Sequence, residues 1–201
     1  TGNAVFGDGT GTDTVTLSGT GKNLSVSGTT TLNADVSTSG TQTYTGAVTL
    51  ATANRTLTGT TITNSSTITG ATFSLAITGD SVINGAISGV NVFSVSGTTN
   101  ISANSISTTG TQTYSGAVTL SNSGTLTLTT TDDNISLYSI AGSGKNLTLN
   151  PGTGTISVTA TVGSSSNGLG LLVVTNSGGT TFGGAFEAEA VVLTNTTGTI
   201  T

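Results

Sequence analysis

The stretch GTQTYTGAVTL occupies residues 40–50, and an almost identical stretch, GTQTYSGAVTL, occupies residues 110–120. Ten of the eleven positions agree, and the single difference is Thr45 in the first copy against Ser115 in the second. Neither copy contains a charged side chain. An uncharged stretch that is written twice indicates a repeated structural unit rather than a reactive site.

Other stretches also return later in the chain. LSVSGTT at 24–30 returns as FSVSGTT at 93–99, GTGKNLSV at 19–26 returns as GSGKNLTL at 142–149, and TGNAVFG at 1–7 resembles TGDSVIN at 78–84. These copies define two repeat units, about 1–77 and 78–150, within a single repetitive segment that spans residues 1–201. A long period of about 70 residues is typical of stacked coils.

Within each unit, apolar residues recur at i and i+2 with Thr or Ser between them, which predicts short strands with one buried side. The pairs are Val15/Leu17, Leu24/Val26, Val48/Leu50, Leu75/Ile77, Val118/Leu120, Leu126/Leu128, Ile135/Leu137, Leu147/Leu149 and Ile156/Val158. Neighbouring pairs often start 8 or 9 residues apart, with Gly, Asn, Ser or Asp between them, and these are turn residues. Almost no segment shows a helical pattern.

Short strands inside a long repeat predict an all-β solenoid with about three strands per coil. Each coil would take roughly 22–25 residues, so about three coils would fill one 70-residue period. We expect Ala, Val, Ile and Leu inside, Gly and Asn at the corners, and each copied stretch on a like coil in register. Eight or nine coils would give a rod roughly 40 Å long.

The composition excludes several classes of function. Charged residues make up 5% of the chain, against roughly 25% in an average protein, and Cys, His, Met and Trp are absent. The usual zinc ligands, thiol nucleophiles and the commonest general base are therefore missing. Lys22, Arg55 and Lys145 are too few for a nucleic-acid surface, and no apolar run suits membrane insertion. We expect no enzyme activity and no cofactor.

Runs such as LTGTTITNSSTITGATFSLAITGDSVINGAIS, SVSGTTNISANSISTTG and VTNSGGTTFGGAF, with the GTQTYTGAVTL stretch, resemble the β-strand repeats of filamentous-haemagglutinin-type proteins. These are bacterial surface adhesins exported by two-partner or autotransporter routes. The resemblance implies a right-handed parallel β-helix in an extracellular or cell-surface fibre. Its partners would be further solenoid coils, copies of itself, or host and neighbouring-cell glycans. Residues 159–175 depart from the pattern and suggest a looser coil, and we expect the native chain to continue beyond both ends.

Two acidic turns are candidate metal sites. FGDGTGTD at 6–13 places Asp8 and Asp13 in a glycine-rich turn, as calcium-binding β-rolls do, but those need several stacked copies. Asp132 and Asp133 precede Asn134 and a strand. Asp and Asn also favour turns by bonding their own backbone, and this interpretation is the stronger one at both places.

Glu187 and Glu189 lie two residues apart in GAFEAEAVVL, and paired carboxylates hydrolyse polysaccharides in some enzymes. Alternation instead predicts Phe186, Ala188, Ala190 and Val192 inside, with both carboxylates in water. GTGKN and GSGKN faintly resemble phosphate loops, but a strand rather than a helix should follow each.

Tyr44 and Tyr114 are the repeated aromatic residues, and they suit either a contact with sugars or a neighbouring fibre, or packing over a corner of the core. Thr-x-Thr pairs suggest an ice-binding or glycan-binding solenoid as an alternative function. The pairs start at residues 14, 41, 56, 61, 67 and 111, and this spacing shows no regular array.

Overall fold

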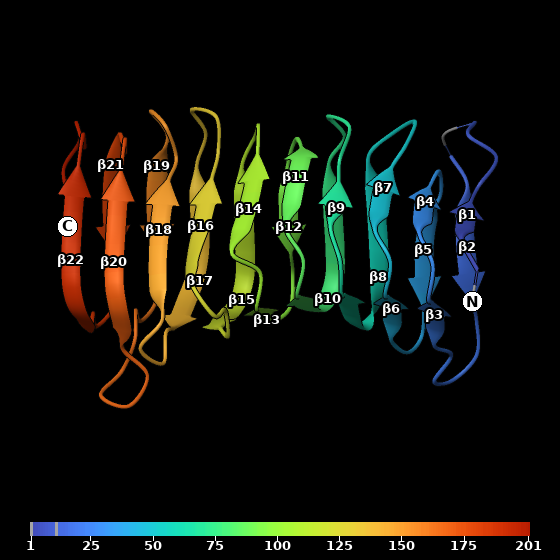
Figure 1. Ribbon diagram of the computed structural model, residues 1–201, viewed down its shortest axis with the longest axis horizontal. Coiled ribbons are helices and arrows are strands. Elements are labelled where there is room, and N and C mark those ends of the chain that lie inside the picture. Colours follow the sequence, from blue (N-terminus) through green and yellow to red (C-terminus); the bar gives the residue numbers. More distant parts are fainter. Residues whose placement is uncertain (1, 11) are drawn as a thin grey trace.

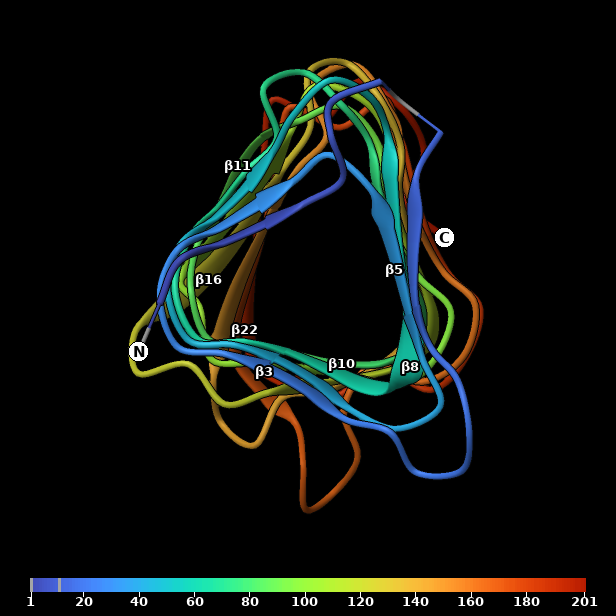
Figure 2. The same cartoon turned by 90° about the vertical axis from the view of Figure 1, so that its right-hand side faces the viewer.

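The computed structural model describes residues 2–10 and 12–201, and all the named elements of secondary structure within them are β-strands. The strands stack along one axis, and the coils outline a triangle when viewed along that axis (Figures 1 and 2). Seen from the N-terminal end in Figure 2, the chain runs clockwise as it recedes, so the helix is right-handed. The expected right-handed parallel β-helix, with about three strands in each of about nine turns, is confirmed.

The first face of the triangle is one ten-stranded parallel sheet. Its strands in spatial order are β1 (Ala4–Phe6), β4 (Thr30–Leu32), β7 (Val48–Leu50), β9 (Ile68–Thr69), β11 (Ile87–Val90), β14 (Ser105–Thr108), β16 (Thr125–Thr129), β18 (Asn146–Asn150), β20 (Leu169–Thr175) and β22 (Ala188–Thr194). Each coil therefore bonds to the coil before it and the coil after it.

The second and third faces share long strands that bend around the corner between them. The second face contains β2 (Thr14–Leu17), β5 (Asp35–Thr38), β12 (Phe93–Val95), β19 (Thr155–Val158), β21 (Gly179–Phe182) and the first parts of β8 (Arg55–Asn64), β10 (Leu75–Ile83), β15 (Gln112–Leu120) and β17 (Ile135–Ala141). The third face contains β3 (Leu24–Val26), β6 (Gln42–Tyr44), β13 (Thr99–Ile101) and the second parts of those four strands.

The core is a continuous column of inward side chains. The strand pairs that alternation predicts all point inward, and from Val26 to Val158 their apolar side chains are buried. Val15 and Leu24 at the first coil are partly buried against the same core. Since burial of each Val, Leu or Ile contributes roughly 1.5–3 kcal/mol, the core is the main source of stability.

Glycine occupies corners where neighbouring coils approach too closely for a side chain. Gly79 lies at the bend of β10 with a φ of +129°, and a Cβ there would overlap the carbonyl oxygen of Gly59 in the coil before. Gly97 and Gly116 extend this stack, because a Cβ at each would meet the backbone of the glycine one coil earlier. The predicted glycine corners are thus sites of close backbone contact.

The coils vary in length. The coil from Thr30 to its partner Val48 is much shorter than the coil from Ala4 to its partner Thr30. The sequence-based estimate of roughly 22–25 residues per coil lies between these two extremes and misses the short coils. The pairing on the first face also shifts register once, between Ile87 and Val90 of β11.

The copied stretches do not lie on the same face, which corrects the expectation that they stack in register. In the first copy, Tyr44 lies on the third face opposite Asn64 of β8. In the second copy, Tyr114 lies on the second face opposite Val95 and Leu137. The long sequence period therefore spans three turns and two faces rather than a whole number of turns.

The two boundaries suggested by the sequence fall differently in the structure. Residues 77 and 78, where one repeat unit would end and the next begin, lie inside the continuous strand β10. Within the expected looser coil, residues 163–168 form a loop that projects from the rod (the orange loop in Figure 2), whereas Leu169–Thr175 is the regular strand β20. The irregularity is therefore confined to one corner.

Candidate binding face

Tyr44 lies in the core and is only 1% exposed, so it cannot contact a sugar. Its hydroxyl donates to Oε1 of the buried Gln42 at 2.7 Å. Nε2 of Gln42 in turn donates to the carbonyl oxygens of Val36 at 3.0 Å and of Thr58, in the next coil, at 2.8 Å. The pair therefore satisfies its own polar atoms and links two coils at a corner.

Tyr114 repeats this arrangement at a different corner. Its hydroxyl donates to Oε1 of Gln112 at 3.2 Å, and Nε2 of Gln112 donates to the carbonyl oxygens of Ile106 and Thr129 at 3.1 and 2.8 Å. The Tyr114 ring also packs edge-on against Phe93, with 5.9 Å between ring centroids. Tyr44 and Tyr114 therefore both have the packing role, and neither is placed to contact a sugar or a neighbouring fibre.

Asp8 and Asp13 use their carboxylates inside the turn that they belong to. Oδ1 of Asp8 accepts hydrogen bonds from the hydroxyl and the amide of Thr10, and Oδ2 of Asp13 accepts one from the Asp8 amide at 2.9 Å. The Thr10 hydroxyl, followed by its amide, lowers the pKa of Asp8 below its ordinary value. Gly11, in the middle of this turn, lies outside the described residues.

Asp132 and Asp133 also act as turn residues. Asp132 has a φ of 60°, and its Oδ1 accepts a hydrogen bond from the Thr153 amide one coil later at 2.8 Å. Oδ1 of Asp133 accepts one from the Asn134 amide at 2.9 Å. Across residues 2–10 and 12–201, no three His, Cys, Asp or Glu side chains gather into a cluster that could hold a metal ion.

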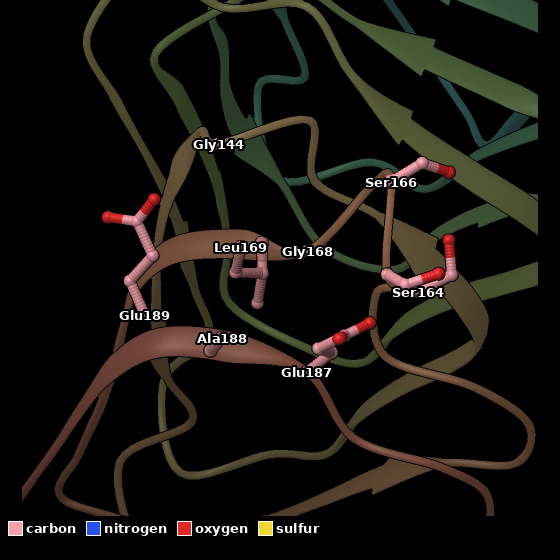
Figure 3. Close-up of a pocket in the computed structure, with 9 residues that line it drawn as sticks. Gly144, Ser164, Ser166, Gly168, Leu169, Glu187, Ala188 and Glu189 are labelled. Atoms are coloured by element: carbon pink, nitrogen blue, oxygen red, sulfur yellow. The ribbon is translucent and has the colours of Figure 1, made fainter.

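Glu187 and Glu189 line an open cavity of about 400 Å³ between the 163–168 loop and the last coil. Figure 3 shows the Glu187 carboxylate turned toward Ser164, whereas the Glu189 carboxylate lies at the opposite side of the cavity, beyond Leu169. A glycosidase needs two carboxyl groups that face each other across one sugar. These two diverge, so the cavity does not have that geometry.

The alternation predicted for this segment is out of phase in β22. Val191 and Leu193 pair with the buried Leu172 and Val174 and so point toward the core, while Val192 pairs with the outward Val173. The pairing register with β20 is constant, but the alternation of inward and outward side chains slips by one residue between Leu169 and Leu172 of β20 and between the paired Ala188 and Val191 of β22. As the last strand of its sheet, β22 leaves Val191 44% and Leu193 48% exposed.

Each lysine loop leads into a strand, as predicted. GTGKN precedes β3, and the Asn of GSGKN begins β18. Neither segment opens a helix, so neither has the phosphate-binding geometry of a P-loop.

The second face carries an array of hydroxyl groups that sequence spacing did not reveal. Strand register aligns its outward side chains in two columns, which we call the hydroxyl columns. The first column is Thr14, Asp35, Thr56, Ala76, Ser94, Thr113, Ser136, Ser157 and Thr181. The second column begins with Thr16, Ser37, Thr58 and Thr78. It continues with Ser96, Ser115, Tyr138 and Thr159, each of which lies two residues after a member of the first column. Asp35, Ala76 and Tyr138 are the three interruptions.

Tyr138 is the feature of this face that sequence analysis missed. Its side chain is 49% exposed, whereas Tyr44 and Tyr114 are buried. It borders a shallow hollow of about 190 Å³ whose outward walls are Thr113, Ser115, Ser136 and Thr159 of the hydroxyl columns. The signal in the sequence was Tyr at a position of the I-S-L-Y strand where alternation predicts an outward side chain.

No known protein family, curated protein or solved structure matches this chain. Among the described residues there is no helix of the length and apolarity needed to cross a membrane.

Proposed function

We propose that the chain is a structural segment of an exported bacterial surface or extracellular fibre, with no catalytic activity of its own. The observation that carries this proposal is the uninterrupted first face, in which ten parallel strands pair in sequence from β1 to β22. Backbone ladders of this kind join every coil to its neighbours, so the rod is stiff without disulfides or metals.

The surface supports the same role. The outward positions are mostly Thr and Ser. Both side chains are polar, and Thr is also β-branched, so they suit a long exposed sheet. The carboxylates of Asp8 and Asp132 accept hydrogen bonds from backbone amides in the turns. The carboxylates of Glu187 and Glu189 point away from each other. A rod of this kind separates or presents whatever lies along its axis.

The test is to locate the native chain on its producing cells. We expect antibodies raised against residues 1–201 to label intact cells, and external protease to remove the signal. Lysed cells treated in the same way provide the control for antibody access. Detection of the chain in the cytosolic fraction alone would refute the proposal.

Ice binding, the other alternative, is less well supported. A surface that orders water needs a flat, unbroken array of hydroxyl groups. The hydroxyl columns align many such groups, but Ala76 lacks a hydroxyl and Tyr138 places a half-exposed aromatic ring among them. Thermal hysteresis equal to that of buffer is the expected result.

A further inference from the structure

The part of the second face around Tyr138 combines an exposed ring with uncharged hydroxyl groups. Thr113, Ser115, Ser136 and Thr159 surround the hollow that Tyr138 borders. A phenol ring offers an apolar face with a polar tip, and each hydroxyl both donates and accepts hydrogen bonds. This combination matches a sugar ring, which has apolar C–H faces and hydroxyl groups at its edge.

Exposure of Tyr138 is not required by the fold. Its column neighbours Ser115 and Thr159 show that a small hydroxyl side chain fits the same column. The other described tyrosines are buried, because burial of an aromatic ring is favourable. An aromatic ring left half-exposed beside a hollow is a surface available to a ligand.

The charge of this face selects the class of sugar. The hollow has no charged side chain, and the hydroxyl columns contain one charge, the carboxylate of Asp35. The chain as a whole has a net charge of −5. Sulfated or sialylated polymers would meet no cation here and would be repelled overall. Neutral polysaccharides meet neither penalty.

We propose that the hydroxyl columns around Tyr138 bind a neutral polysaccharide, with one sugar ring stacked on Tyr138. Neighbouring sugars extend over the columns, where hydroxyl groups recur about every 4.8 Å along the rod. A shallow site that buries one ring binds weakly, with Kd on the order of millimolar. This inference goes beyond the structural role and depends on this face alone, whether or not the chain forms a fibre.

The test uses the 201-residue chain with cellohexaose, chitohexaose and mannohexaose as neutral probes and a heparin hexasaccharide as the anionic probe. Amide chemical shifts report where each probe binds. We expect at least one neutral probe to shift Ser115, Tyr138 and Thr159 and heparin to shift none of them. Tyr138→Ser should weaken binding about tenfold, and Tyr138→Phe should keep it within about twofold.

Thr129→Ala, on the first face, is the matched control and should bind as the parent does. Circular dichroism of each variant checks that the solenoid is intact. The proposal is overturned if no neutral probe shifts these residues at about 10 mM, a concentration above the expected Kd. It is also overturned if binding survives Tyr138→Ser unchanged or if only heparin binds. A cytosolic location of the native chain would refute the fibre without affecting these results.

Discussion

Gln42 and Gln112 show how single residues hold this rod together. Each amide group accepts from a tyrosine hydroxyl and donates to one carbonyl of its own coil and one of the following coil. Thr38 and Thr108 close the same corners by donating to the carbonyl oxygens of Gly40 and Gly110. Buried polar groups that are fully paired specify one arrangement of a core.

Gln42→Leu should therefore cost more than loss of one hydrogen bond. It leaves the Tyr44 hydroxyl and the Val36 and Thr58 carbonyls without this partner, and we expect the free energy of unfolding to fall by about 2–4 kcal/mol. Tyr44→Phe, the control, removes only one hydroxyl and should cost about 1 kcal/mol. Urea unfolding measures both, and equal costs would contradict this description of the corner.

The buried tyrosines also make stability depend on high pH. Burial raises the pKa of Tyr44 and Tyr114 above the ordinary value of 10. The folded state thus keeps these protons longer than the unfolded state, so their contribution is intact below about pH 10 and is lost as the pH rises further. Each tyrosine should lower the free energy of unfolding by about 1.4 kcal/mol for every pH unit above about pH 10.

Urea unfolding at several pH values from about 9 to about 11.5 measures this slope. The double variant Tyr44→Phe, Tyr114→Phe should show a flatter dependence than the parent above about pH 10. An identical slope in both proteins would mean that the phenols ionise without unfolding the rod.

At the scale of the strands, the copied segment works equally well on different faces. On the third face, Tyr44 pairs with Asn64, which pairs with Ile83, which pairs with Ile101 three turns after Tyr44. From Ile101 the chain passes through the first face and reaches Tyr114 on the second face. Both copies nevertheless make the same Gln–Tyr contacts. The two corners that the copies occupy are thus equivalent for this segment, because its contacts are local or reach one coil away.

Cysteine cross-linking tests this shift of face. Asn100 lies in the column that contains Thr43, and its partner in the next coil is Thr119. Asn100→Cys with Thr119→Cys should form a disulfide, since Cα atoms of paired strands fall within disulfide range. Asn100→Cys with Thr113→Cys is the control and should not, because Thr113 lies on the second face beside Ser94. The reverse outcome would place both copies on one face.

At the scale of the whole molecule, the sequence was sufficient for the architecture but not for the arrangement of its surface. Alternation identifies inward pairs such as Leu126/Leu128, and the repeats identify a solenoid. Which face a strand occupies depends on how many turns and bends precede it, and the unequal lengths of the coils make that count unpredictable. Alignment of Tyr138 with Ser115 was therefore visible only in the structure.

Arg55 illustrates a second limit. Arginine side chains are mostly exposed in folded proteins, yet Arg55 is 2% exposed. Its guanidinium donates to the carbonyl oxygens of Leu32 and Ala51 and to the Thr52 hydroxyl. These acceptors come from the corner of two successive coils, and no local pattern in the sequence brings them together.

Cryo-electron microscopy of the native protein from the surface of its producing cells tests the central claim, that this chain is part of a stiff solenoid fibre. We predict rods of uniform triangular cross-section with strands perpendicular to the axis and a repeat of about 4.8 Å along it. Compact particles without that axial repeat, or a flexible chain without a fixed cross-section, would contradict the account.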